Sequence, residues 1–240
     1  MQSGVIVDSS GVEIARWAFS DRSGGFSAPP YESLNLAMHV GDAPIAVAAN
    51  RSVLANALAV PADRIVYPGL THSVAVGLVD EPVGLFPDVD VLMTSKRKIG
   101  LATLGADCVP VIVVDAKRRI AMTAHVGWRG AAAGIVDSIS SSLAQAGGSL
   151  KNAHVLLGPA ICGECYRVDP DRREQVMAVL PEAGDRSDQG IDLRDGLIAA
   201  LSKLGAKVQR VGGCTAEDVS LFSHRRDGVT GRQGAAVVLA

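Results

Sequence analysis

The chain has 240 residues, 48% of them hydrophobic and 20% charged, with a formal net charge of −2 at pH 7. This length suits one domain spanning residues 1–240, and the apolar content excludes a disordered chain because it is enough to build a core. Lys and Arg are spread along the sequence, so neither nucleic acid nor a membrane surface is predicted as a partner.

Strand and helix patterns alternate from the N-terminus onward. A hairpin comes first, with strands at residues 5–7 and 12–19 turned at residues 9–11. A loop rich in glycine and proline follows at residues 20–30. Further strands are predicted at residues 65–67, 73–79, 89–93, 100–104, 109–114, 120–123, 154–157, 208–211 and 235–239, and helices at residues 44–58, 131–146, 172–180 and 193–204. This alternation predicts an α/β or α+β class.

The sequence has neither a secretory signal pattern nor an apolar run of about 20 residues, the length that spans a bilayer. Its four cysteines, Cys108, Cys162, Cys165 and Cys214, are too few and too dispersed for a disulfide framework. We therefore expect a cytoplasmic protein, with monomer and homodimer both open. Cys162 and Cys165 have CxxC spacing, but a single such pair is a weak metal signal, so we interpret them as two incidental thiols.

Three metal-binding side chains stand at the ends of apolar runs. Cys108 precedes one predicted strand, His125 follows the next, and His72 lies upstream between two others. One cysteine and two histidines form a suitable set of three protein ligands for catalytic zinc, which leaves a fourth position open. The same set also accepts copper, so the residues alone do not choose the metal. Asp107, beside the cysteine, is a candidate supporting residue or base.

The same residues allow a second chemistry. Cys108 could be a nucleophile activated by His125, as in cysteine hydrolases. Gly127 and Gly130, close to the start of a predicted helix, would then supply backbone N–H groups for an oxyanion or a phosphate. Arg129 lies between these glycines and is a further candidate anion ligand. The two chemistries predict opposite responses to a chelator.

Two stretches around these residues resemble the motifs of a known family. They are Ala-Asp-Cys-Val-Pro at 106–110 and His-Val-Gly-Trp-Arg-Gly at 125–130. Both are similar to motifs of the YfiH family, also called the laccase-domain or polyphenol oxidase family. The resemblance runs nearly end to end and includes residues 19–27, 31–36, 40–42, 50–51, 90, 158–161, 165–166 and 222–227.

This resemblance implies a layered single-domain sandwich with a mixed β-sheet core and flanking helices, similar to bacterial deamidating toxins. It also implies a metal site formed by His72, Cys108 and His125. The implied activity is zinc-dependent phosphorolysis of adenosine, inosine and methylthioadenosine, with adenosine deamination as a second activity. The alternatives are hydrolytic editing of serine-containing muramyl nucleotide precursors of peptidoglycan and copper-dependent oxidation of phenols. The last is disfavoured by the five histidines of the chain, since laccase chemistry needs several copper ions.

Nucleoside phosphorolysis requires an anion site and a group that stabilises the departing base. We predict Arg51 and Arg129 as phosphate ligands, with Asp107 and Asn35 as further catalytic groups. The sequence departs from the family pattern beside the ligands, with Leu-Thr-His at 70–72 in place of Gln-Val-His and Gly105 in place of threonine. These changes keep the metal ligands and alter their surroundings.

Overall fold

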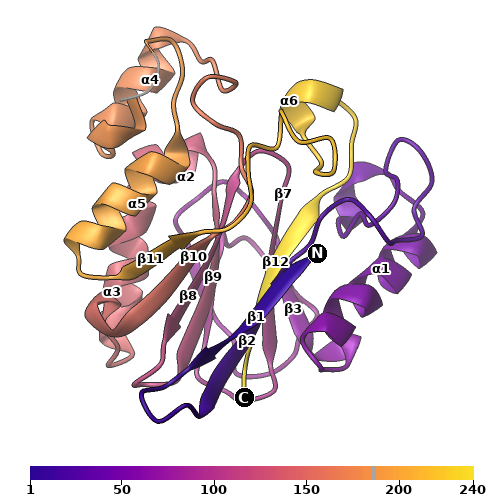
Figure 1. Ribbon diagram of the computed structural model, residues 1–240, viewed down its shortest axis with the longest axis vertical. Coiled ribbons are helices and arrows are strands. Elements are labelled where there is room, and N and C mark those ends of the chain that lie inside the picture. Colours follow the sequence, from indigo (N-terminus) through magenta and orange to yellow (C-terminus); the bar gives the residue numbers. More distant parts are fainter. Residues whose placement is uncertain (185–187) are drawn as a thin grey trace.

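The computed structural model describes residues 1–184 and 188–240 and has two mixed six-stranded β-sheets with helices on their outer faces (Figure 1). The strands are β1 (Gln2–Val7), β2 (Glu13–Phe19), β3 (Ile65–Pro68), β4 (Val76–Leu78), β5 (Leu85–Phe86), β6 (Val91–Thr94), β7 (Gly100–Gly105), β8 (Val109–Asp115), β9 (Ile120–Val126), β10 (Ala153–Leu157), β11 (Lys207–Arg210) and β12 (Gln233–Leu239). The helices are α1 (Pro44–Ala57), α2 (Trp128–Ala132), α3 (Ile135–Gln145), α4 (Pro170–Met177), α5 (Leu193–Lys203) and α6 (His224–Asp227), with 3₁₀ turns at Met38–Val40, Ala62–Arg64, Leu150–Asn152 and Pro181–Gly184. The predicted α/β class is confirmed.

The first sheet has the strand order β1-β2-β12-β7-β3-β5. Its first four strands are antiparallel neighbours, whereas β3 runs parallel to β7 and to β5. The predicted N-terminal hairpin is present, and its turn is held by Asp8, whose carboxylate accepts hydrogen bonds from Ser10 N and Val12 N. Gly11 supplies the positive φ of 82° that this turn requires.

The second sheet has the order β11-β10-β8-β9-β6-β4. At its centre, β8 and β9 form the predicted hairpin, in register from Val109 opposite Val126 to Asp115 opposite Ile120. Every residue of both strands is buried, as expected for central strands that are covered on both faces. This hairpin therefore gives the candidate site a rigid base.

Three apolar clusters fill the spaces between the layers. Side chains of β2, β7 and β12 meet those of β8, β9 and β10 between the two sheets, with Phe19 and Ile112 among the largest. Outside the second sheet, α3 and α5 cover the strands with Ile139, Leu143 and Leu197. Outside the first sheet, α1 contributes Leu54 and its neighbours. The molecule is thus a four-layer helix–sheet–sheet–helix sandwich (Figure 1).

Several predicted elements have different bounds in the structure, and the causes are visible in three of them. The predicted helix at 131–146 is two helices, α2 and α3, because Gly134 adopts the left-handed conformation with a φ of 84°. The predicted helix at 172–180 begins earlier, because the Asp169 carboxylate caps it by accepting a hydrogen bond from Arg172 N and Pro170 occupies its first turn. The predicted strand at 73–79 is reduced to β4, since Ser73 is held in a loop by Asp90.

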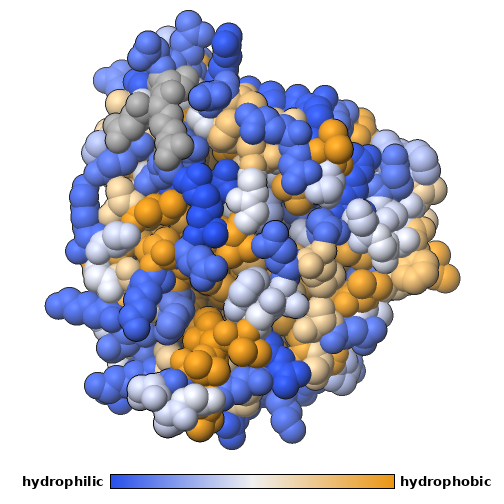
Figure 2. Space-filling model, in the orientation of Figure 1, coloured by the Kyte–Doolittle hydropathy of each residue, from blue (hydrophilic) through white to orange (hydrophobic). Residues whose placement is uncertain are grey.

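Hydrophilic residues cover much of the face seen in Figure 2, with hydrophobic residues in separate groups among them. Among the described residues, no helix combines the length and apolar character that crossing a membrane requires.

Candidate metal centre

A cavity of about 840 Å³ lies where β3 and β7 end and β8 begins. Its lining comes from segments that are far apart in the sequence. These residues are Met38, His39, Arg51, Tyr67, Pro68, Gly69, Leu70, Thr71, His72, Leu85, Pro87, Asp88, Leu104, Gly105, Ala106, Cys108, His125, His224 and Arg232. The cavity has the size of a typical small-molecule site, about 300–1,000 Å³.

The three predicted metal ligands meet in the wall of this cavity. The potential ligand atoms of His72, Cys108 and His125 all lie within 4.8 Å of one another. The β8–β9 hairpin accounts for two of them, because Pro110 pairs with His125 and Cys108 lies two residues before Pro110, just ahead of the start of β8. The ring centroids of His72 and His125 are 4.7 Å apart in an edge-to-face arrangement.

Asp90 connects two of the three ligands, His72 and His125. It is fully buried just before β6, and its Oδ1 accepts hydrogen bonds from His125 Nδ1 at 2.9 Å and from His72 N at 3.0 Å. Its Oδ2 accepts four more, from the backbone N–H and hydroxyl groups of Thr71 and Ser73. One carboxylate therefore orients the His125 ring, leaves its Nε2 for the cavity, and fixes the loop that carries His72.

The charges of the site are set by its own side chains, and a metal ion would have to displace the proton of His125 in order to bind. Burial lowers the pKa of His125, but the Cys108 sulfur and the Asp90 carboxylate outweigh this effect and raise the pKa to about 9. Burial also raises the pKa of Asp90, yet hydrogen bonds from His125 and Ser73 hold it well below its usual range. Desolvation and His125 lower the pKa of His72, so its imidazole is neutral at pH 7, as metal binding requires.

Gly127 is required by the packing of the three ligands. A Cβ at this position would lie 2.7 Å from His72 Nδ1 and 3.2 Å from Cys108 Sγ. Any side chain would thus occupy the space between these two ligand atoms. The residues present fit a metal ion, since they combine a soft sulfur, two imidazoles, a carboxylate that orients one imidazole, and a clear space at Gly127.

Replacing Asp90 with asparagine is expected to lower metal affinity about 10- to 100-fold. The carboxylate of Asp90 now accepts hydrogen bonds from N–H groups, and the amide nitrogen of asparagine could not accept them. His125 would also lose its anionic partner. The matched control is Asp88→Asn, because Asp88 is exposed in the same cavity and its positive φ of 53° suits asparagine. Zinc affinity is measured by chelator competition. Equal affinities in the two variants would contradict this role of Asp90.

Two arginines face the same cavity. Arg51, on α1, donates from Nε to Leu36 O at 3.0 Å, and its guanidinium stacks 3.7 Å from the centre of the Tyr67 ring. Within residues 1–184 and 188–240, no acceptor is found for its terminal nitrogens. Arg232 is held by carbonyl groups at Thr230 and Gly231 through Nη1. The structure thus places predicted Arg51 in the cavity and adds Arg232 beside it.

The position of Asp107 does not support the predicted role as a base. Its Oδ1 accepts from Thr215 Oγ1 at 2.6 Å and Ser223 Oγ at 2.7 Å, and its Oδ2 accepts from Arg225 N at 2.7 Å. It is absent from the cavity lining, although Ala106 and Cys108 on either side belong to it. Asp107 therefore ties together segments remote in sequence, and its positive φ of 96° turns the chain into β8.

Asn35 also lies outside the cavity lining, contrary to a direct catalytic role. It is fully buried, donates from Nδ2 to Ala37 O and Asp42 Oδ2, and accepts on Oδ1 from Ala37 N and Arg232 N. Both polar atoms of its side chain are thereby used inside the protein. Its link to Arg232 makes it a support for a cavity arginine.

The phosphate cradle was predicted at residues 127–130, ahead of a helix expected to begin at residue 131, but these residues are arranged differently in the structure. The helix begins at Trp128, so Gly130 lies inside α2, where its lack of a side chain allows close contact with Ser73 O. Arg129 is exposed, stacks 4.7 Å from the Trp128 ring, and is not part of the cavity lining. Its charge does reach the site, since it contributes to the lowered pKa of His72.

Sequence reasoning gave no role to Asp90, His39 and Arg232. Asp90 lies within the predicted strand at 89–93 and among the residues that resemble the family, but neither observation assigns a role to it. Desolvation and the charges of Arg232 and Arg51 lower the pKa of His39, which shows how close these three cavity groups lie. No sequence pattern joins residues 39, 51 and 232, because only the fold brings them together.

The chain belongs to the laccase-domain, or YfiH, family: the model of the family described as multi-copper polyphenol oxidoreductase laccase matches residues 16–240. Among its relatives is a purine nucleoside phosphorylase of Mycobacterium tuberculosis, 41% identical over 223 residues, covering 90% of this chain and 88% of the relative. One of Streptomyces coelicolor is 40% identical over 231 residues, covering 94% and 96%.

Solved structures agree with this assignment. The fold is similar to the hypothetical protein YfiH of Bacillus licheniformis, with a TM-score of 0.86, 30% identity, and coverage of 94% of this chain and 93% of that one. YlmD of Geobacillus stearothermophilus gives the same TM-score and identity, covering 94% and 92%. The predicted family and its layered fold are both confirmed.

Proposed function

We propose that this chain is a zinc-dependent purine nucleoside phosphorylase that acts on adenosine, inosine and methylthioadenosine and also deaminates adenosine. The observation that carries the proposal is the convergence of His72, Cys108 and His125 beside two arginines in one cavity. The names of the curated relatives support the reaction class. A bound divalent cation would supply Lewis acidity and an acidified water at this wall of the cavity.

The cavity offers separate surfaces for the two substrates. Its apolar lining includes Met38, Leu70, Leu85 and Leu104, which would pack against a purine ring. Arg51 and Arg232 bind and orient phosphate, because their guanidinium groups suit phosphate oxygens. In phosphorolysis a phosphate oxygen bonds to the anomeric carbon while the N-glycosidic bond breaks. The bonding electrons leave with the purine, which takes up a proton.

Replacing Arg51 with glutamine is expected to raise the KM for phosphate roughly ten- to a hundredfold, the cost of one charge-assisted contact. The comparison variant is Arg129→Gln, the other arginine that the sequence indicates, which lies outside the cavity lining. Initial rates at varied phosphate concentration measure both. A larger rise of the phosphate KM in Arg129→Gln would overturn this assignment.

A second candidate is a metal-free cysteine hydrolase, with cell-wall muramyl nucleotides as its substrate class. It is favoured by the Cys108–His125–Asp90 chain, in which Asp90 accepts from His125 Nδ1 and the Cys108 sulfur interacts with His125. Such an order resembles a nucleophile, a base and an orienting carboxylate. The position of His72 favours the metal, because a hydrolase of this kind has no use for a second imidazole within 4.8 Å.

One substrate screen separates these functions. Zinc-loaded protein is incubated with adenosine, inosine or methylthioadenosine, with and without phosphate, and then with a serine-containing muramyl nucleotide. We expect phosphate-dependent release of free base, and inosine formed from adenosine in either case. Consumption of the muramyl nucleotide alone, with stoichiometric inactivation of metal-free protein by iodoacetamide, would support the hydrolase instead.

A further inference from the structure

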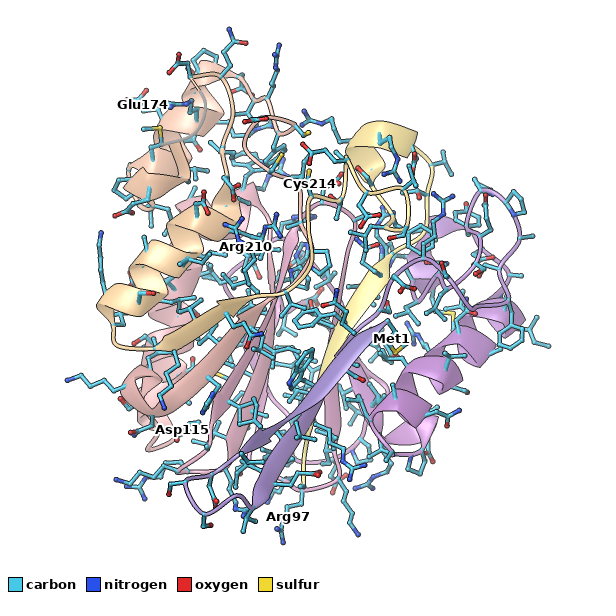
Figure 3. All side chains as sticks on the ribbon, in the orientation of Figure 1. Met1, Arg97, Asp115, Glu174, Arg210 and Cys214 are labelled. Atoms are coloured by element: carbon cyan, nitrogen blue, oxygen red, sulfur yellow. The ribbon has the colours of Figure 1, made fainter. Side chains whose placement is uncertain are left out.

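A second group of metal-binding side chains lies away from the cavity. The CxxC pair, Cys162 and Cys165, is in the loop between β10 and α4, and Cys214 follows β11. The potential ligand atoms of these three cysteines and Glu217 all lie within 4.8 Å of one another. Figure 3 shows Cys214 between the loops that connect to α4 and α6. The sequence alone indicated two incidental thiols, and the fold adds a third thiol and a carboxylate to this pair.

Backbone hydrogen bonds hold the two loops together. Ala160 and Cys214 form a parallel β-bridge, and Thr215 N donates to Ala160 O at 3.2 Å. Cys162 N donates to the sulfur of Cys214 at 3.3 Å. The thiols of Cys162 and Cys165 each lie 3.5 Å from the same Glu217 carboxylate oxygen. All the cysteines are free thiols, so the sulfurs remain available as ligands.

We propose that Cys162, Cys165, Cys214 and Glu217 form a structural zinc site, separate from the candidate catalytic centre. Four protein ligands complete a tetrahedral shell with no open position, which is the arrangement of structural zinc. Ligands about 2.3 Å from a tetrahedral zinc lie about 3.8 Å from one another. Here two thiols lie 3.5 Å from the Glu217 oxygen, and all four ligand atoms lie within 4.8 Å of one another. Thiolates select a soft cation, and the carboxylate favours a divalent one.

Nearby cations offset the charge of such a site. Arg194 is 2% exposed and donates from Nη1 to the carbonyl groups of Gly212 and Gly213, immediately before Cys214. Arg225 donates from Nη1 to the carbonyl of Cys165 at 3.5 Å. Three thiolates and a carboxylate around Zn²⁺ carry a net negative charge, so these guanidinium groups stabilise the occupied site.

A metal ion at this site would stabilise the position of Asp107, the residue that precedes Cys108. Thr215, next to Cys214, donates its hydroxyl hydrogen bond to Asp107, and Ile161 N, next to Cys162, donates to Asp107 O at 3.0 Å. The loop that carries Cys162 and the loop that carries Cys214 therefore both donate hydrogen bonds to Asp107, the residue before Cys108. The bound zinc therefore stabilises the fold at this point, and it takes no part in the reaction.

The test uses the full chain and zinc itself, counted by plasma mass spectrometry after dialysis. We expect two zinc ions per chain in the unaltered protein, one in Cys162→Ser/Cys165→Ser and one in Cys108→Ser. With Co²⁺ in place of zinc, the Cys108→Ser protein keeps an intense thiolate-to-metal charge-transfer band, whereas the double variant loses most of it. A double variant that still binds two ions, or a Cys108→Ser protein that binds none, overturns the proposal.

A milder pair of variants covers the case in which the double variant does not fold. Glu217→Gln is expected to weaken zinc binding at this site at least tenfold, while Glu164→Gln leaves it unchanged, because Glu164 lies between the two cysteines but outside the ligand group. Equal zinc affinities in both variants contradict the role of Glu217. Thiol titration in denaturant without reductant should find all four cysteines free, and finding two would indicate a disulfide and overturn the proposal.

Discussion

The Cys108→Ser variant is expected to lose the metal of the cavity site and at least about a hundredfold in nucleoside turnover. The serine hydroxyl remains protonated and is a poor ligand for zinc, whereas the thiol gives up its proton on binding. His72 and His125 alone would then have to hold the ion. Zinc content and phosphate-dependent cleavage of adenosine measure the two effects on the same sample.

A companion variant distinguishes a ligand from a nucleophile at this position. Aspartate is an accepted zinc ligand, so Cys108→Asp should recover part of the zinc content and part of the activity lost in Cys108→Ser. A serine variant that keeps its metal and yet loses all activity would instead identify the sulfur as the attacking group. Circular dichroism confirms that both variants are folded.

The Gly127→Ala variant is expected to weaken zinc binding about 10- to 100-fold and to lower activity with it. The added methyl group would lie 2.7 Å from His72 Nδ1 and 3.2 Å from Cys108 Sγ, so one ligand would have to move. This steric effect changes neither the charge nor the number of ligands. A loss of binding would therefore show that the ligand atoms converge beside Gly127.

The matched control for this steric effect is Gly213→Ala, where an added Cβ meets no atom within 4 Å. It should keep cavity zinc affinity and nucleoside turnover within twofold of the unaltered protein. If Gly127→Ala behaves like this control, the metal does not bind between His72 and Cys108. Thermal unfolding of both variants separates an effect on the site from an effect on the fold.

The fold was predictable where the pattern of a segment is local. The β8–β9 hairpin and helix α1 follow from their apolar periodicity and turn residues. The break at Gly134 was not predictable, because the helix pattern continues through it and only the backbone conformation ends α2. The pairing of twelve strands into two sheets depends on contacts between distant segments, which periodicity does not encode.

The residues of the candidate site that lie within the two sequence motifs were predictable. Cys108 and His125 are joined by one hairpin, so their proximity follows from the sequence. His72 was a candidate by its residue type, and the family resemblance made it the expected third ligand. The surroundings of Asp107 were not predictable, because its partners Thr215, Ser223 and Arg225 come from the other half of the chain. In the sequence, an acidic residue beside a cysteine cannot be recognised as a catalytic base or as a residue that holds distant segments together by hydrogen bonds.

The polar residues that line this site are held in position by hydrogen bonds to buried side chains that do not line the cavity themselves. Asp90 orients His125 and fixes the His72 loop, and Asn35 holds the backbone of Arg232. Ligand and arginine positions thus depend on buried hydrogen bonds, which keep the site in one arrangement before substrate binds. Substitutions of these supports should change affinity without removing any contact to substrate.

Metal removal and restoration test the central claim most directly. Zinc is removed from the protein with a chelator, and plasma mass spectrometry confirms that none remains. Phosphate-dependent cleavage of adenosine is then measured before and after zinc is returned. We predict that activity disappears with the metal, returns when the unaltered protein again holds two zinc ions per chain, and does not return in Cys108→Ser. Full activity in protein that contains no metal would contradict this account of the site.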